Sequence, residues 1–589
     1  MIRGWIRRAG MLGCAGLMAA APWLNLAPAR KALPDAGDLF GYVYQLVART
    51  FASLEVDRLA AALLLAACLW LCRRFLFRKP AGTGVGEYGL CAFFSLMTLL
   101  CTAVRTQDTV AVLWENAFQV CKAGLFLAGM YLIFLMLLRA LRKGLEKGRQ
   151  AGLPSSLSGL RRYDTFWRLF AVIAAAWLPQ ILIRYPGVLM WDSYMQIKQF
   201  MGEAERISSH PPFGTLVYGL LAWLGEAAGN RNLVYFVFTL LQCAAYIAVL
   251  SYTLCVMRRL GAPGWVRLTA LLLYALSPCY AGWATVIAKD TMFQIPFLLM
   301  VTLLWEFARE REAFFESWHR PALLGLSFLV MALSLVLAVG VEAAISAALG
   351  IRDRYMQDVL SLPFQQTARV VKLHGEEIPR EEREIIDRVL DYDSLAEGYN
   401  DWYADAVKDT YRQTATAEDR RAYWGVWWRQ LCRWPTEYLD AALHMNGVLF
   451  DLRSNEPMYI SFSDMALDTY VYPWSFNDMT MYDREALVPL SSAQRALTEW
   501  YMDFDKLPLI GLCASMSFNV LLTLALLYQC VTERRRNILP VFLPALATLL
   551  VCLFSPVVYL RYALPLIGSV PVALAACAAR LDKGARRSL

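Results

Sequence analysis

An aspartate, a histidine and two aromatic residues lie within one short stretch of the chain, and side chains of these types can transfer protons. Asp192 follows Trp191, Tyr194 comes two residues later, and His210 precedes two prolines. A carboxylate or an imidazole in a partly dry environment can exchange a proton with a substrate near neutral pH. The loop 185–212 is therefore the first candidate for a catalytic site.

Two further pairs of polar residues border the apolar part of the chain, Lys289-Asp290 and Arg561-Tyr562. Charges beside membrane spans are rarer than charges on a soluble surface and are more often functional. Simple structural roles stay open for each of them. Asp192 could cap a helix, Lys289 and Asp290 could form an ion pair at a helix start, and Arg561 could extend to the membrane surface.

The composition predicts a polytopic α-helical membrane protein. Of 589 residues, 58% are hydrophobic and 18% are charged, and the mean hydropathy is +0.40. A helix needs about 20 apolar residues to cross a bilayer, and about twelve runs approach that length. They are 9–28, 58–77, 88–105, 119–140, 166–184, 233–255, 266–283, 291–307, 321–345, 509–530, 537–556 and 563–580. The shorter run 213–225 predicts an interfacial or re-entrant segment.

Basic residues gather between alternate runs, and short loops rich in Lys and Arg stay in the cytoplasm. With twelve spans, all of these clusters fall on one side together with both termini. The sequence thus predicts a multi-pass plasma-membrane protein whose loop 185–212 and two polar pairs share the extracytoplasmic face. The first run, which ends at Ala27-Pro28-Ala29, fits either a membrane anchor or a cleaved signal peptide.

The hydrophilic segment 351–508 lies on the same outer side in this topology. It carries 17 Lys and Arg against 28 Asp and Glu, and it has the length of an ordinary domain. Aromatic residues at helical spacing between 423 and 431 predict a helix, so a mainly helical extracytoplasmic domain is expected. Solvation is a sufficient reason for its acidity. The basic remainder suits anionic lipid, and no feature indicates a nucleic-acid partner.

The order of several short motifs resembles the GT-C fold of membrane glycosyltransferases. That order is an acidic loop, His-Pro-Pro, Ser-Pro before an outer loop ending in Lys-Asp, and a late Arg-Tyr near a proline. In this chain the motifs are Trp191-Asp192-Ser193, His210-Pro211-Pro212, Ser277-Pro278, Lys289-Asp290 and Arg561-Tyr562-Ala563-Leu564-Pro565. The likeness covers roughly residues 165–580. The chain is similar to an uncharacterised bacterial branch of the superfamily.

The resemblance implies an enzyme that moves a sugar from a polyprenyl-phosphate donor to an acceptor hydroxyl of a glycan, lipid or protein, with inversion. The general base would be Asp192, and the ligands of the donor phosphate would be His210, Lys289 and Arg561. The supporting residues would be Trp191, Tyr194, Asp290 and Tyr562. No cofactor is certain, but a divalent metal ion could be shared by Asp192 and Asp290.

The chain departs from the GT-C pattern in two respects. The acidic loop normally follows the first span, whereas four runs precede it here, so residues 1–145 are expected to form an added module. A GT-C-like core would then occupy 146–350, the outer domain 351–508, and the last helices with a basic cytoplasmic tail 509–589. The acidic loop also has one aspartate with no adjacent acid, which weakens the case for a metal ion.

Two other classes of protein share some of these features. A transporter or flippase of lipid-linked glycans also has many spans and intramembrane polar groups. Such proteins are expected to place those groups near the middle of the bilayer, whereas the charges here gather at its outer boundary. A noncatalytic scaffold for envelope assembly would need the outer domain but would not need Asp192.

Overall fold

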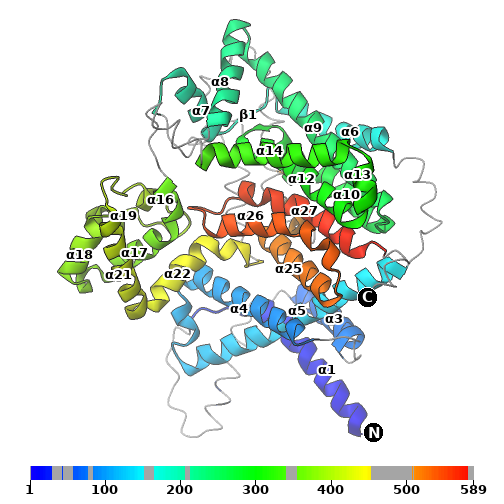
Figure 1. Cartoon of the computed structure of the whole chain (residues 1–589). Helices are drawn as coiled ribbons and strands as arrows, with labels where there is room; N and C mark the ends of the chain where they lie inside the picture. The colour runs from blue at the N-terminus through cyan, green and yellow to red at the C-terminus, as the bar shows by residue number, and fades with distance from the viewer. Residues whose placement is uncertain are drawn as a thin grey trace. The chain divides into compact units, whose positions relative to one another are not determined.

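The computed structural model describes residues 2–28, 58–76, 84–150, 165–205, 212–339, 355–452 and 510–580, with a few isolated positions. Of these described residues, 82% are helical. It divides into two compact units (Figure 1). Unit 1 joins Met1–Gly144 to Leu360–Ser454, and unit 2 joins Leu145–Val359 to Asn455–Leu589. Unit 1 therefore contains helices from both the N-terminal module and the segment predicted as an outer domain.

Several helices are long and apolar enough to cross a membrane, as a helical membrane protein requires. Among the described residues they are α4 (Val85–Gln107), α5 (Ala117–Gln150), α6 (Phe166–Ile183), α9 (Arg231–Arg259), α12 (Lys289–Arg309) and α27 (Leu560–Ala578). Two shorter apolar helices are α25 (Met516–Thr532) and α26 (Leu543–Leu553). These helices agree with the predicted class, and the larger count of about twelve spans stays a prediction.

The apolar run 266–283 is not one continuous helix, contrary to the sequence prediction. Helix α10 (Gly264–Leu276) ends at Ser277, and α11 (Pro278–Ala284) begins directly after it. The Ser277 hydroxyl accepts a hydrogen bond from the Cys279 amide, and Pro278 takes the first helical position, where its missing N–H is not needed. All residues of α11 are buried. This run therefore turns inside unit 2 instead of passing straight through it.

Unit 1 packs the first apolar helices against a group of shorter helices from the middle of the chain. Its N-terminal elements are α1 (Ile2–Ala20), η1 (Ala21–Trp23), α3 (Arg58–Leu71), η2 (Cys72–Leu76), α4, η3 (Val110–Leu113) and most of α5. The later elements are α17 (Ser361–His374), η6 (Gly375–Glu377), α18 (Arg380–Asp387), α19 (Tyr392–Gly398), α20 (Asp405–Lys408), α21 (Ala417–Arg433), α22 (Pro435–Asn446) and η7 (Gly447–Leu449). Helix α22 packs on both α17 and α4, so it links the two groups.

The end of α1 is held firmly against α5. A Cβ atom added at Gly129 of α5 would lie 2.6 Å from the Leu17 carbonyl oxygen of α1 and 2.4 Å from the Cβ of Ala21 in η1, so α1 and α5 meet too closely here for a larger residue. Lys122, which is buried, donates hydrogen bonds to the carbonyls of Asn25 and Ala27 at 2.9 and 2.6 Å. The first helix and the turn after it are therefore a packed part of unit 1.

The aromatic run in the middle of the chain forms α21, as its spacing predicts. A capping box begins this helix, because Thr416 and Asp419 each accept a hydrogen bond from the other's backbone N–H. Tyr423 is buried, whereas Trp424 and Trp428 are 40% and 62% exposed. The aromatic residues thus divide between the core and the surface of unit 1.

Unit 2 contains most of the candidate spans and the two strands. Its elements up to the second strand are α6, β1 (Val188–Leu189), α7 (Trp191–Met201), α8 (Pro212–Ala227), α9, α10, α11 and β2 (Val286–Ile287). They are followed by α12, α13 (Arg311–Glu316), α14 (His319–Val339), α16 (Tyr355–Val359), η11 (Gly511–Ala514), α25, η12 (Arg536–Val541), α26 and α27. Helix α12 packs against α9, α14 and α27.

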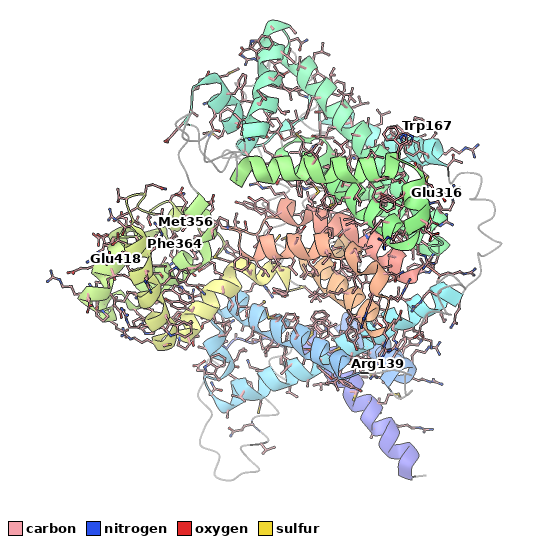
Figure 2. All side chains as sticks on the ribbon, in the orientation of Figure 1. Arg139, Trp167, Glu316, Met356, Phe364 and Glu418 are labelled. Carbon is pink, nitrogen blue, oxygen red and sulfur yellow. The ribbon has the colours of Figure 1, made fainter. Side chains whose placement is uncertain are left out.

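Burial differs strongly among the apolar helices of unit 2. The apolar window of α27 is 89% buried, whereas that of α6 is 28% buried. Trp167 near the start of α6 is 75% exposed and lies at the surface in Figure 2. An apolar helix that exposes most of its side chains suits a lipid-facing position, and α27 is a central helix of its unit.

A short parallel pairing of β1 and β2 brings two distant loops together. Val188 lies opposite Val286, and Leu189 lies opposite Ile287, and all four are buried. Gly187 precedes β1 with a φ of +117°, and a Cβ there would lie 2.2 Å from the hydroxyl oxygen of Thr239. Only glycine fits this position without strain. Because α7 follows β1 and α12 follows β2, the pairing fixes the starts of both helices side by side.

The opposite ends of α12 and α27 carry a separate set of charged contacts. Glu306, near the end of α12, is fully buried and pairs with Arg259 at the end of α9. Arg535 donates hydrogen bonds to the carbonyls of Ala576 and Cys577 at the end of α27. Unit 2 therefore has charged residues at both ends of α12 and α27, and the two sets are distinct.

Candidate active site

Three helices of unit 2 begin at one place, and each has a charged residue in its first or second position. Asp192 is the second residue of α7, Lys289 and Asp290 open α12, and Arg561 is the second residue of α27. The Ser193 hydroxyl donates a hydrogen bond to the Ile287 carbonyl at 2.6 Å, which ties the start of α7 to the end of β2. The β1–β2 pairing thus explains how residues almost 100 positions apart come together.

The four charged side chains form one cluster. Lys289 Nζ lies 3.3 Å from Asp192 Oδ2, and Arg561 Nη2 lies 3.7 Å from the same oxygen. Arg561 Nε lies 4.0 Å from Asp290 Oδ2. The exposed fractions of these side chains run from 9% for Arg561 to 31% for Lys289. The cluster therefore balances two carboxylates against two cations, and solvent reaches it in part.

Arg561 is oriented by two tyrosines as well as by the carboxylates. Its guanidinium carbon lies 5.0 Å from the ring centre of Tyr559 and 5.1 Å from that of Tyr562. Its Nη2 also donates a hydrogen bond to the Tyr562 hydroxyl at 3.2 Å. Contacts of a guanidinium with aromatic faces are attractive. The planar cation is thus positioned before any ligand arrives.

The two carboxylates are not simple helix caps. The residue in the N-cap position of α7 is Met190, and that of α12 is Ala288, so Asp192 and Asp290 both lie inside the first turn. The capping role considered for Asp192 is therefore wrong. Within the described part of the chain, the buried Oδ2 of Asp290 has no hydrogen-bond partner, although Arg561 is near. This oxygen can still accept a proton or a hydrogen bond.

The other predicted site residues differ in where they lie. Tyr194 is buried in an apolar cluster with Tyr218 and Ile287, so it supports α7 through packing. The backbone of Trp191 begins α7, but its side chain lies outside the described residues, as does all of His210. Tyr562 contacts Arg561 directly. The structure thus brings together Asp192, Lys289, Asp290, Arg561 and Tyr562.

Three residues that position the site had no assigned role in the sequence analysis. Arg184, buried at the end of α6, donates hydrogen bonds to the Gly282 carbonyl and the Thr285 hydroxyl at 2.9 and 2.8 Å. Gln242 on α9 donates to two carbonyls on either side of the start of β2, at 3.0 and 2.9 Å. Tyr559 adds the second ring beside Arg561. A buried polar residue within an apolar run, such as Gln242, was the available signal.

The carboxylates of this cluster fit a metal ion poorly. Asp192 Oδ2 lies within 4 Å of both Lys289 and Arg561, and Asp290 Oδ2 faces Arg561 as well. A divalent ion between these oxygens would stand beside two fixed cations, which repel it. Asp192 and Asp290 are therefore poor metal ligands here. Lys289 and Arg561 instead suit the cluster to an anionic ligand.

Comparison with known proteins gives one match. A model described as "Family of unknown function (DUF6020)" matches residues 208–339 and 318–588. No curated protein and no solved structure matches the chain. Lys289, Asp290 and Arg561 lie within the matched ranges, and Asp192 precedes them. Because the matched ranges together span well over half of the sequence, this chain belongs to DUF6020, a family of unknown function.

Proposed function

We propose that this protein is a membrane glycosyltransferase that transfers a sugar from a polyprenyl-phosphate donor to an acceptor hydroxyl, with inversion at the anomeric carbon. The observation that carries the proposal is the convergence of Asp192, Lys289 and Arg561 at the starts of α7, α12 and α27. A base and two cations at one partly dry position match the needs of this reaction.

The proposed step needs one proton acceptor. The acceptor oxygen attacks the anomeric carbon, and the bond from that carbon to the phosphate oxygen breaks, with its electron pair going to the phosphate. The acceptor hydroxyl proton passes to Asp192. A new glycosidic bond and a polyprenyl phosphate result, so no further reactant is needed. A positioned carboxylate contributes about 10²–10⁴-fold to such a transfer.

The departing phosphate needs positive charge around it. Lys289 and Arg561 supply it, and the N-terminal ends of three helices add backbone N–H groups that favour an anion. In the structure both cations lie on Asp192. We infer that the donor phosphate draws them from Asp192 and so frees this carboxylate to take the proton. His210 stays a proposed additional phosphate ligand.

The position of the cluster suits a lipid-borne donor. Its charged residues lie within the first two positions of α12 and α27, which are both long enough to span a membrane. A phosphate at the lipid surface would meet them there, whereas a transporter site would be expected near the middle of a span. The basic residues at the far ends, such as Arg259 and Arg535, favour a cytoplasmic location for those ends. The site would then be extracytoplasmic, as the sequence predicts, with both termini in the cytoplasm.

The proposal is tested by sugar transfer with purified protein in lipid nanodiscs. The donors would be a panel of radiolabelled short-chain polyprenyl-phosphate sugars, and the acceptors would come from envelope glycans and lipids of the expression host. We expect transfer by the wild type and a fall of at least about 100-fold in kcat for Asp192→Asn. Glu226→Gln is the matched control, because Glu226 pairs with Arg231 at an exposed place in the same unit. Equal turnover by the wild type and Asp192→Asn would refute the base assignment.

A further inference from the structure

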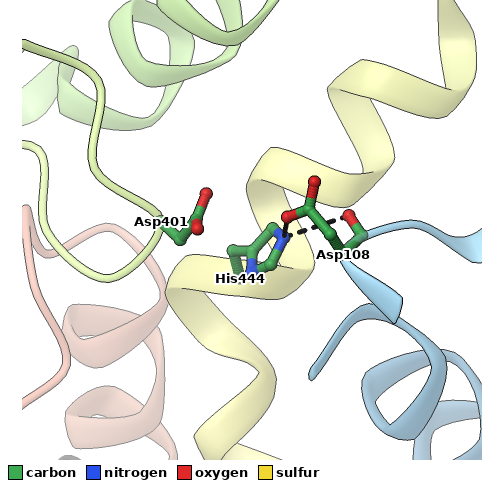
Figure 3. A group of neighbouring side chains, drawn as sticks. All are labelled: Asp108, Asp401 and His444. Carbon is green, nitrogen blue, oxygen red and sulfur yellow. Dashed lines mark hydrogen bonds and ion pairs between the residues drawn. The ribbon is translucent and has the colours of Figure 1, made fainter. Parts of the chain in front are cut away.

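A histidine and two aspartates from distant parts of the sequence meet in unit 1. Asp108 follows the end of α4, Asp401 lies between α19 and α20, and His444 is on α22 (Figure 3). His444 Nε2 lies 2.9 Å from Asp108 Oδ1. One potential ligand atom from each residue lies within 4.8 Å of the other two. Ligand atoms at about 2.0–2.6 Å from a common ion are spaced in this way.

The surroundings of this trio carry more negative than positive charge. The guanidinium of Arg369 on α17 is 3% exposed and lies 3.2 Å from Asp108 Oδ2 and 3.7 Å from Asp401 Oδ1. It also lies 3.4 Å from Glu437 and 3.6 Å from Asp440. Four carboxylates therefore surround one arginine. Insufficient compensating charge is most unfavourable for Asp440, the fully buried member of the four.

One carboxylate that shares Arg369 with the trio is fully buried. Asp440 is fully buried, and one of its oxygens accepts a hydrogen bond from the Val110 amide at 2.9 Å. Among the described residues its other oxygen, Oδ2, has no hydrogen-bond partner and faces Arg369 at 3.6 Å. This buried oxygen has only the ion pair with Arg369, which faces three other carboxylates as well, so one arginine does not fully compensate the cluster.

Of the two Asp108 oxygens, the one nearer to His444 is held less closely by Arg369. Asp108 Oδ1 lies 2.9 Å from His444 Nε2 and also accepts a hydrogen bond from Arg369 Nη1 at 3.5 Å, whereas Oδ2 accepts a shorter one from Arg369 Nη2 at 3.2 Å. Ligating carboxylates are commonly held by hydrogen bonds in this way. Asp108 and Asp401 are 61% and 39% exposed, so solvent reaches the trio.

We propose that Asp108, Asp401 and His444 form a binding site for a first-row divalent cation of the Zn²⁺ type. An imidazole favours such ions over Ca²⁺ and Mg²⁺, which prefer oxygen ligands alone. The ion reduces the excess negative charge and joins the turn after α4 to α22 and to the loop at Asp401. The site thus clamps the N-terminal helices of unit 1 to its later helices. This inference is independent of the proposed transferase activity.

The test is Zn²⁺ binding by the full-length protein in detergent after treatment with EDTA and dialysis. Isothermal titration and metal analysis should show one tightly bound Zn²⁺ per chain, and Zn²⁺ should raise the Tm. His444→Gln and Asp401→Asn should each weaken Zn²⁺ binding at least about 10-fold. Asp401→Asn is the more informative variant, since it leaves the contact between His444 and Asp108 in place.

His374→Gln is the matched control. His374 is also in unit 1 and beside carboxylates, Glu377 and Glu437, but it is not part of the trio. This variant should bind Zn²⁺ as the wild type does. The proposal is overturned if the wild type retains no stoichiometric Zn²⁺, if His444→Gln and Asp401→Asn bind it unchanged, or if Ca²⁺ binds more tightly than Zn²⁺. The last result would exclude the imidazole as a ligand.

Discussion

The charged clusters of the two units differ in their balance of charge. In unit 2, Asp192 and Asp290 meet two cations, Lys289 and Arg561. In unit 1, one cation, Arg369, meets four carboxylates. A balanced cluster can bind a phosphate by exchanging one anion for another, whereas a cluster with excess negative charge is suited to a cation. Clusters of similar residue types can therefore bind ligands of opposite charge.

The largest effect is expected from removing Arg369, the arginine that meets the four carboxylates in unit 1. Arg369→Met leaves the fully buried Asp440 without its cation, and breaking a buried pair in this way destabilises a protein by about 3–5 kcal/mol. The measurement is unfolding by denaturant or heat in detergent. Arg412→Met is the control, because Arg412 pairs with Asp387 and Asp391 at an exposed place, and such pairs contribute about 0–1 kcal/mol. Equal losses of unfolding free energy for the two variants would contradict the importance of Arg369 in the unit 1 cluster.

A smaller effect is expected from changing the shape of the corresponding cation in unit 2. Arg561→Lys keeps the charge but loses the planar group that contacts the rings of Tyr559 and Tyr562. We expect the KM for the polyprenyl-phosphate donor to rise about 10-fold, with the acceptor KM unchanged, and steady-state kinetics would measure both. Arg231→Lys, at an exposed ion pair of the same unit, is the control. A rise in the acceptor KM alone would contradict the phosphate role.

The pairing of β1 with β2 is expected to matter for activity as well as for folding. Gly187→Ala places a methyl group against Thr239 at a φ of +117° and should shift the start of α7. A displacement of about 1 Å can lower kcat by up to about 100-fold. Gly202→Ala is the matched control, since its φ is +81° but nothing lies within 4 Å of the added Cβ. If both variants lost the same activity, backbone strain alone would be responsible.

The smallest effect is expected on the pH dependence of thermal stability, through Asp440 in unit 1. Burial raises the pKa of Asp440 above its ordinary value of 3.8. The folded state therefore holds this proton more strongly than the unfolded state, a contribution that is complete below the ordinary pKa and is lost as the pH rises through the raised value. In EDTA, Asp440→Asn should have a higher Tm than the wild type at pH 7, and the difference should shrink toward pH 4. A lower Tm at pH 7 would show that the charge of Asp440 is stabilising.

The sequence predicted the gathering of the site in unit 2 better than the details of its geometry. The predicted topology assigned the loops that carry Asp192, Lys289 and Arg561 to the same side of the membrane. Because short loops keep the helix starts on that side near one another, these residues were expected to lie together. It did not predict that Met190, and not Asp192, precedes the first turn of α7. The break at Ser277 was missed because the run 266–283 is apolar throughout, and hydropathy alone does not register a serine cap followed by proline.

The cluster of unit 1 was beyond prediction from sequence. His444 and Asp108 are 336 residues apart and belong to segments expected to fold separately. No short motif joins them, since their contact depends on the packing of α22 against α4. Arg369 reads in the sequence as one charge among many in an acidic segment. Long-range packing of this kind is visible only in the folded chain.

In the proposed mechanism, Lys289 and Arg561 move from Asp192 to the donor phosphate. The direct measurement is binding of a short-chain polyprenyl phosphate to the wild type and to Asp192→Asn, made beside the transfer assay. Asp192→Asn removes the anion that competes for both cations, so it should bind the phosphate several-fold more tightly while its kcat falls about 100-fold. Weaker phosphate binding by Asp192→Asn, or tighter binding with unchanged kcat, would contradict the account.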